Sequence, residues 1–190
     1  MKIGIDLDNI CVTTTQAVCD YINERLPVHI TLEDITTYSI ESALPDKYKW
    51  IVGSAFRDKF MWQKVQIIAD AVKYIEILYN DGHEIYFVTS SLPENMRKKI
   101  NHLSRNMHFL PKDYVEKHTI NIQRKQLLDI DILIDDCIEQ LKKPRWYISI
   151  CLDYPWNRNY FEKSLFHCKN WEEIYNKVKE IEKEVAADDV

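Results

Sequence analysis

Short apolar runs alternate with longer amphipathic segments along this chain of 190 residues. The short runs are bounded by polar or turn-forming residues and predict buried β-strands at residues 2–6, 83–88, 132–134 and 147–152. The longer segments repeat apolar residues every three or four positions and predict helices at residues 13–25, 46–60, 67–79, 93–103 and 171–185. Residues 31–34 resemble a capping box, and Asn170 is suited to cap the last helix. Strands that alternate with helices are typical of an α/β fold with a parallel sheet.

The first two predicted strands are separated by far more chain than a simple crossover needs. About a dozen residues can join parallel strands, whereas about seventy-five lie between these two. The excess predicts a helical cap at residues 13–66, inserted after the first strand of a Rossmann-like core at residues 1–12 and 67–190. The cap segment is rich in aromatic residues, namely Tyr38, Tyr48, Trp50, Phe56, Phe60 and Trp62. These side chains either form the core of the cap or stack on a substrate ring. The three nearest the return to the core, Phe56, Phe60 and Trp62, are the candidates for substrate contact.

Polar residues of a restricted kind stand where the predicted strands end. In chain order they are Asp6 and Asp8, then Thr89 with Ser90, then Lys125, then Asp135 and Asp136. The carboxyl ends of parallel strands share one edge of an open sheet, and ligands bind there. Carboxylates suit a hard cation such as Mg²⁺, while hydroxyl and ammonium groups suit a phosphate. The pattern therefore predicts a phosphoryl-transfer site.

Each of these residues also has an ordinary structural explanation. A D-x-D pair can cap a turn, threonine is common at strand ends, and a single lysine usually lies on the surface. The adjacent pair of Asp135 and Asp136 is more specific, because neighbouring carboxylates repel each other and a cation relieves the repulsion. In the functional interpretation, Asp6 attacks phosphorus and Asp8 acts as general acid and base.

Composition excludes several classes of function. The chain is 46% hydrophobic and 29% charged, with a net charge of −5, so no basic face for a nucleic-acid polymer is expected. No apolar stretch approaches the roughly 20 residues that a membrane helix needs. The five cysteines form no C-x-x-C pair, and the sequence begins on a strand rather than a signal peptide, so we expect reduced thiols and a cytoplasmic location. With three glycines and no glycine-rich loop, any phosphate must be held by other groups.

The order D-x-D, T, K and DD resembles the four motifs of the haloacid dehalogenase superfamily of phosphohydrolases. The resemblance implies that Asp6 is a nucleophile that forms an aspartyl-phosphate. It also implies that Asp8 is the acid and base and lends its main-chain carbonyl to Mg²⁺. Thr89 and Lys125 would stabilise the phosphoryl group. Asp136, beside Asp135, would complete the metal site. A second acid at position 8 is similar to the phosphatase subgroup. A cap between the first two motifs is the C1 arrangement.

Four segments are similar to a narrower family, the 5′(3′)-deoxyribonucleotidases of cytosolic type C. They are LEDITTY, RKQLLDIDILIDD, LDYPWN and NWEEI. This resemblance implies a Mg²⁺-dependent nucleotidase that acts on nucleoside monophosphates, often deoxypyrimidine ones. The sequence departs from the family pattern twice: Asn9 replaces the usual glycine, and Thr14 stands where an aromatic residue is expected.

Two alternatives stay open at this stage. A phosphatase of the same superfamily that acts on another small phosphate, such as a sugar phosphate, would need the same motifs. A phospho-receiver or a nucleotide-binding scaffold without turnover would also use aspartate, threonine and lysine on a parallel sheet. The order of the motifs and the long cap argue against a receiver. The sequence predicts no oligomeric state and no base preference.

Overall fold

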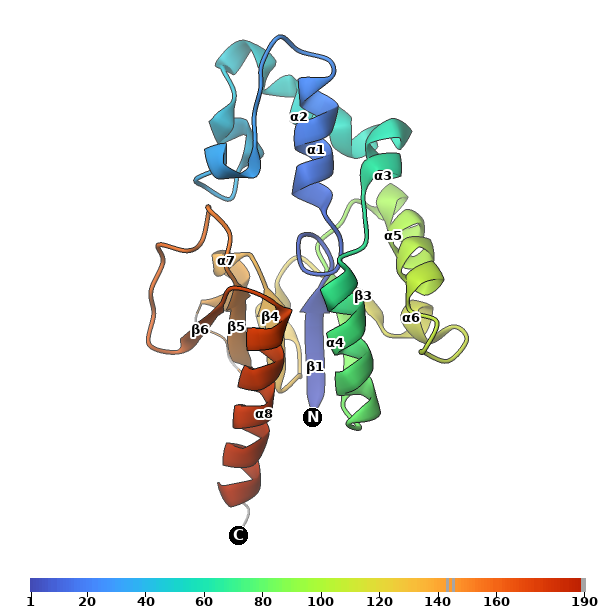
Figure 1. Cartoon of the computed structure of the whole chain (residues 1–190), viewed down its shortest axis with the longest axis vertical. Helices are drawn as coiled ribbons and strands as arrows, with labels where there is room; N and C mark the ends of the chain where they lie inside the picture. The colour runs from blue at the N-terminus through green and yellow to red at the C-terminus, as the bar shows by residue number, and fades with distance from the viewer. Residues whose placement is uncertain (143, 145, 189–190) are drawn as a thin grey trace.

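A six-stranded parallel sheet forms the centre of the protein, as seen in a computed structural model that describes residues 1–142, 144 and 146–188 (Figure 1). The strand order is β3-β2-β1-β4-β5-β6. The strands are β1 (Lys2–Asp6), β2 (Glu84–Thr89), β3 (Thr119–Asn121), β4 (Ile132–Asp135), β5 (Ile148–Leu152) and β6 (Leu165–Cys168). All neighbours pair in parallel, so the predicted α/β fold is confirmed.

Helices connect these strands and cover the sheet. The α-helices are α1 (Thr14–Asn23), α2 (Trp50–Arg57), α3 (Lys59–Lys64), α4 (Ala69–Asn80), α5 (Pro93–Asn106), α6 (Tyr114–Lys117), α7 (Ile138–Leu141) and α8 (Trp171–Asp188). Short 3-10 helices are η1 (Leu32–Asp34), η2 (Ile40–Ala43), η3 (Asp46–Tyr48) and η4 (Lys125–Leu127). Among the described residues, no helix is both long and apolar enough to cross a membrane.

Both faces of the central strands are buried. In β4, Ile132 and Ile134 join the large core cluster, while Leu133 between them joins a smaller cluster on the other face. This is the alternation expected of a parallel sheet covered by helices on both sides. Gly4 in β1 leaves space for this packing, because a Cβ atom there would lie 2.6 Å from Cδ1 of Ile130. The sheet is therefore a rigid base for the residues at its edge.

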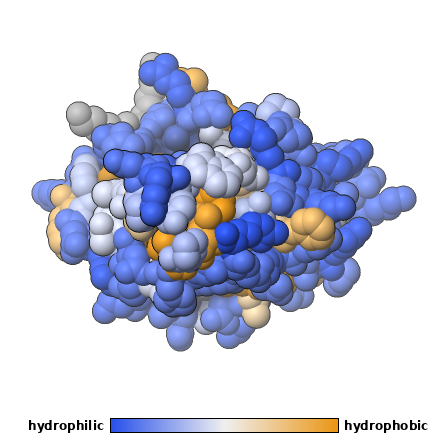
Figure 2. Space-filling view, turned by 90° about the horizontal axis from the view of Figure 1, so that it is seen from above, coloured by the Kyte–Doolittle hydropathy of each residue, from blue (hydrophilic) through white to orange (hydrophobic). Residues whose placement is uncertain are grey.

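Residues 13–66, which we call the insert, lie beyond the carboxyl end of β1 in Figure 1. Its core is aliphatic: Ile22, Ile51 and Met61 are almost fully buried. Tyr38, Trp50 and Phe60, by contrast, are at least half exposed. Most of the insert's aromatic side chains are thus not its core. Figure 2, which views the molecule from this end, shows a small apolar area within a largely hydrophilic surface.

The sequence prediction was wrong in two details. The helix expected at residues 46–60 is divided into η3, α2 and α3, because Asp58 adopts an extended conformation and its carboxylate accepts a 2.8 Å hydrogen bond from Phe60 N. Strands β3 and β6 were not predicted. They form the two edges of the sheet, they are short, and β3 consists of the residues Thr-Ile-Asn, which lack an apolar pattern.

Candidate active site

Lys125 connects the ends of β1 and β4. Its side chain is buried, and Nζ forms an ion pair with Oδ1 of Asp6 and another, at 2.6 Å, with Oδ2 of Asp135. Burial alone would lower the pKa of Lys125, but the carboxylates of Asp135 and Asp6 raise it above its ordinary value. The lysine is therefore a fixed positive charge between the two strand ends.

Asp136 lies beside this pair but forms no ion pair with any lysine or arginine that the structure describes. Its Oδ2 accepts a 2.9 Å hydrogen bond from Asn9 Nδ2, whereas its buried Oδ1 has no partner among the described residues. Burial, together with the charges of Asp135 and Asp6, raises the pKa of Asp136 well above its usual range. An unpaired carboxylate oxygen in the interior is costly unless something positive binds it.

Three carboxylates converge at this point. One oxygen from each of Asp6, Asp135 and Asp136 lies within 4.8 Å of the other two, and all three residues are buried. Burial raises the pKa of Asp6 to about 7, and Asp135 and Asp8 add to the effect while Lys125 opposes it. This all-oxygen donor set, with one oxygen unpaired, fits a hard divalent cation. Of the residues predicted to form a metal site, Asp6, Asp136 and the adjacent Asp135 are thus brought together, whereas the Asp8 carboxylate is not part of this group.

Asp8 has a different environment, which the sequence analysis did not foresee. Lys99 of α5 forms an ion pair with Oδ2 of Asp8, and Thr14 Oγ1 donates a 2.6 Å hydrogen bond to Oδ1. Burial would raise the pKa of Asp8, but Lys99 and the hydrogen bonds outweigh it, so the pKa lies below its usual value. Asp8 is therefore held as a carboxylate.

Lys99 also reaches the second motif. Its Nζ donates a 3.0 Å hydrogen bond to Thr89 Oγ1, and both residues are buried. A signal for Lys99 exists in the sequence, because Asn95, Lys99 and Leu103 are spaced four apart and form the buried stripe of α5. A lysine within such a stripe needs a buried partner, which here is Asp8.

Asn9, the residue that replaces the family's glycine, has φ of 63°. This left-handed conformation favours glycine, although asparagine tolerates it better than most residues. The side chain bridges two elements: Nδ2 donates to Asp136, and Oδ1 accepts a 3.0 Å hydrogen bond from Thr15 N at the start of α1. Asn9 therefore links the acidic cluster to the insert.

Two cavities of about 300 Å³ each open over Asp8, between the insert and the sheet edge. They share Asp8, Gly53, Phe56 and Ser90, and we call them together the Asp8 mouth. Of the three aromatic candidates, Phe56 lines both cavities and Trp62 lines one. Phe60 is half exposed and is not among the lining residues.

Two further aromatic residues, Tyr38 of the insert and Trp156, line the Asp8 mouth. Trp156 stacks flat on Tyr154 with ring centroids 4.5 Å apart, and Tyr154 donates a 2.7 Å hydrogen bond to Asn9 O. Asn157 fixes the same loop, because its buried Nδ2 donates to the carbonyls of Asp136 and Leu152. The loop after β5 is thus attached to the acidic cluster on one side and to the cavity on the other.

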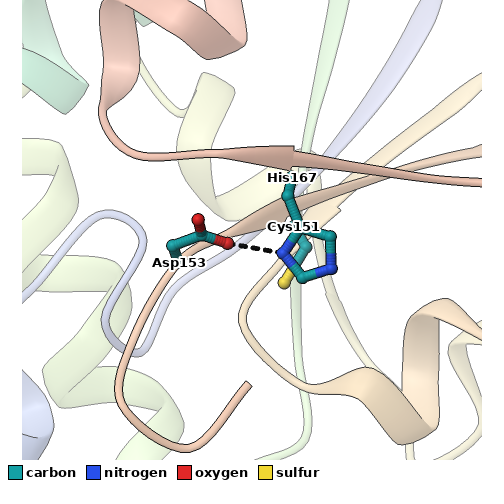
Figure 3. A group of neighbouring side chains, drawn as sticks. All are labelled: Cys151, Asp153 and His167. Atoms are coloured by element: carbon teal, nitrogen blue, oxygen red, sulfur yellow. Dashed lines mark hydrogen bonds and ion pairs between the residues drawn. The ribbon is translucent and has the colours of Figure 1, made fainter. Parts of the chain in front are cut away.

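A second group of possible metal ligands lies at the ends of β5 and β6. Figure 3 shows Cys151, Asp153 and His167 side by side, with a 2.5 Å contact between His167 Nδ1 and Asp153 Oδ1. This group includes a thiol, which burial keeps protonated by raising the pKa of Cys151 above its ordinary value. Its contact between Asp153 and His167 attaches the start of the loop that carries Trp156 to β6.

Comparison with known proteins gives consistent results. The sequence model of the family described as "5' nucleotidase, deoxy (Pyrimidine), cytosolic type C protein" matches residues 1–184. A protein of Staphylococcus epidermidis (strain ATCC 12228 / FDA PCI 1200) named "Putative 5'(3')-deoxyribonucleotidase" is 23% identical over 184 residues, which cover 96% of this chain and 98% of that protein.

Solved structures share the fold. A HAD family hydrolase from Deinococcus radiodurans R1, with bound phosphate and sodium, superposes with a TM-score of 0.60 at 13% identity and covers 94% of this chain and 95% of its own. A haloacid dehalogenase-like hydrolase from Xanthomonas campestris gives 0.58 at 10% identity, with 98% of each chain covered. These likenesses extend over the sheet and the insert together.

Proposed function

Because the chain belongs to the family of cytosolic type C 5′ nucleotidases, we propose that it is a Mg²⁺-dependent 5′-nucleotidase that hydrolyses (deoxy)nucleoside monophosphates through an aspartyl-phosphate on Asp6. Family membership and fold make it a phosphoric monoester hydrolase. The observation that carries the finer proposal is the convergence of Asp6, Asp135 and Asp136 on a point where one buried carboxylate oxygen has no partner.

The charged groups support a division of roles. Lys125 fixes Oδ1 of Asp6 and leaves Oδ2 as the oxygen that attacks phosphorus. The bond between phosphorus and the 5′ oxygen of the nucleoside then breaks, and that oxygen takes a proton from Asp8, which is protonated either by a monoanionic phosphate ester as it binds or by the water of the preceding turnover. In the second step Asp8 accepts a proton from the water that attacks the aspartyl-phosphate, which restores free Asp6 and releases phosphate. The lowered pKa of Asp8 favours this second, basic role in the resting state.

The metal would be held by Asp6 and Asp136, with the main-chain carbonyl of Asp8 as a further ligand that the family resemblance implies. Bound Mg²⁺ supplies positive charge where the transferring phosphoryl group develops negative charge. Lys125 and the hydroxyls of Thr89 and Ser90 are the protein groups proposed to bind the remaining phosphoryl oxygens. Ser90 lines the Asp8 mouth, where it can reach a substrate.

The insert is proposed to act as a cap that selects the substrate. The core chemistry would serve many phosphate esters, so specificity must come from the surfaces above it. Phe56 and Tyr38 from the insert and Trp156 from the opposite loop line the same cavity, which has the aromatic character that suits a planar base. We therefore favour a nucleotide over a sugar phosphate.

The decisive experiment is a panel of nucleoside monophosphates, deoxyribose and hexose phosphates, and p-nitrophenyl phosphate, assayed with Mg²⁺ and with EDTA. We expect hydrolysis of nucleoside monophosphates that disappears in EDTA. In Asp6→Asn, kcat should fall by at least ~10³, or roughly 4 kcal/mol of barrier, while the folded structure is retained. Full activity in EDTA would exclude the metal site, and faster turnover of sugar phosphates than of nucleotides would exclude the substrate class.

A further inference from the structure

A cavity larger than either part of the Asp8 mouth lies elsewhere in the molecule. A crevice of about 440 Å³ lies between α3 of the insert and α5 of the core, and we call it the α3–α5 crevice. Its lining includes Lys59 and Trp62 from α3, and Lys98, His102 and Arg105 from α5. The crevice thus joins the two parts of the molecule at a place that the proposed reaction does not use.

The charge of this crevice is opposite to that of the protein as a whole. The lining residues include four lysines and arginines but no aspartate or glutamate, although the chain has a net charge of −5. Lys99 is neutralised by Asp8. Lys59, Lys98 and Arg105 form no ion pair with any carboxylate in the described part of the chain. Three uncompensated cations around one concave surface create a local positive potential that attracts anions.

Two further features suit a small anion. His102 is one of the lining residues, and its Nε2 is buried without a partner among the described residues. The indole of Trp62 is held in place by a 2.9 Å hydrogen bond from Nε1 to Phe56 O, and Lys98 Nζ lies 5.6 Å from its ring centroid. The indole thus gives the crevice one fixed wall, and the side chains of Lys59, Lys98 and Arg105 are exposed around it.

We propose that the α3–α5 crevice binds a small phosphorylated anion at a site separate from the catalytic one. Lysine and arginine side chains form charge-assisted hydrogen bonds with phosphate oxygens. Lys98 and Arg105 approach from the core and Lys59 from the insert, so one bound anion would connect the two. This proposal concerns a second ligand and does not depend on the identity of the substrate.

The α3–α5 crevice also shares a wall with the proposed catalytic site. Trp62 and Lys99 line both the α3–α5 crevice and one cavity of the Asp8 mouth, so they form the wall between the two. Lys99 contacts Asp8 and Thr89 on the other side of this wall. An anion in the crevice would compete with Asp8 for the ammonium group of Lys99.

Calorimetric titration with inorganic pyrophosphate in EDTA tests the proposal. Without metal, the carboxylates of the catalytic site disfavour an anion there, so binding should report on the crevice. The test variant is Lys98→Glu combined with Arg105→Glu, and the matched control is Lys73→Glu combined with Lys112→Glu, which makes the same change of net charge at exposed positions elsewhere. We expect the test variant to bind at least ~10-fold more weakly and the control to bind nearly as well as the wild type.

Hydrolysis of p-nitrophenyl phosphate with Mg²⁺ and without pyrophosphate should be unchanged in both variants, which shows that they are folded. The proposal is overturned if the wild type binds no pyrophosphate, or if the two variants lose the same amount of affinity. It is also overturned if the test variant binds like the wild type, because pyrophosphate would then occupy the catalytic site. Loss of nucleotidase activity in the wild type would not affect any of these outcomes.

Discussion

The acidic cluster should make the metal-free protein less stable, and Asp136→Asn should remove much of that cost. Asp136 faces Asp6 and Asp135 with oxygens within 4.8 Å, while Lys125 forms ion pairs with the other two acids and not with Asp136. At this separation and an effective dielectric constant of about 20, each like-charge pair costs roughly 3–4 kcal/mol. Asparagine keeps the shape of the side chain and can still accept the hydrogen bond from Asn9.

The expected gain is smaller than the sum of the two pair energies. Lys125 offsets part of the repulsion, and a raised pKa allows Asp136 to bind a proton instead. We therefore expect Asp136→Asn to stabilise the metal-free protein by about 1–3 kcal/mol at neutral pH. For a chain of this size that corresponds to a rise in Tm of roughly 3–9 °C.

The pH dependence gives this prediction a second check. An acid whose folded-state pKa is raised binds its proton more tightly when folded, so stability is lost as pH rises above the unfolded value of about 3.9. The advantage of the asparagine variant should thus be small near pH 4 and should grow towards neutral pH, by at most about 1.4 kcal/mol per pH unit.

The assay is thermal and urea unfolding in EDTA between pH 4.5 and 8, repeated with Mg²⁺. Saturating Mg²⁺ should stabilise the wild type, by about 2.7 kcal/mol at a hundred times Kd, and should have little effect on the variant. Asp129→Asn, at an exposed position, is the control for net charge. A variant that is less stable than the wild type in EDTA, or a difference independent of pH, would refute the reasoning.

Three further predictions concern other parts of the molecule. Lys99→Met should lower the free energy of unfolding by roughly 1–3 kcal/mol in urea titrations, because Asp8 loses its cation. Adding Asp8→Asn should recover most of the loss. If the effects of the two substitutions on the free energy of unfolding simply add, the pair is not coupled. Phe56→Ala should raise KM for a nucleoside monophosphate by the factor that corresponds to roughly 1–3 kcal/mol of lost stacking, and it should leave KM for p-nitrophenyl phosphate almost unchanged. Phe60→Ala, outside the cavities, should change neither KM. His83 is buried, and burial together with the nearby amino terminus lowers its pKa. Its contribution to stability is therefore present above about pH 6.5 and is lost as pH falls. His83→Gln should flatten the loss of stability between pH 7 and 5, measured by urea unfolding.

The positions of Asp6, Thr89 and Asp136 could be predicted from sequence because each stands at or next to the end of a strand. Asp6 and Thr89 are the last residues of β1 and β2, Asp136 follows directly after β4, and the parallel topology brings these strand ends together. The family resemblance inferred from the same residues is confirmed by the match over residues 1–184. No further information was needed to place these groups at one edge of the sheet.

The substrate side of the site was not predictable in the same way. Whether Phe56, Phe60 or Trp62 faces the core depends on how three short helices of the insert pack, and sequence periodicity does not determine that packing. The break at Asp58 rotates α3 relative to α2, so residues close in sequence, such as Phe56 and Phe60, differ in their access to the cavity. Trp156 comes from a loop about ninety positions after the insert, and only the three-dimensional structure places it in the same cavity as Phe56.

Lys99 changes the net charge of the candidate active site. When all are ionised, the carboxylates of Asp6, Asp8, Asp135 and Asp136 face two ammonium groups, those of Lys99 and Lys125. Two negative charges remain, and one divalent cation would neutralise them. The carboxylate oxygen that has no partner among the described residues belongs to Asp136. With Lys125 alone the excess would be three, and a single metal ion would leave a site that still repels a phosphate dianion. The second lysine therefore makes the acidic cluster compatible with its proposed substrate. Lys99 neutralises Asp8 separately, and Lys125 and one divalent metal ion together balance the other three acids.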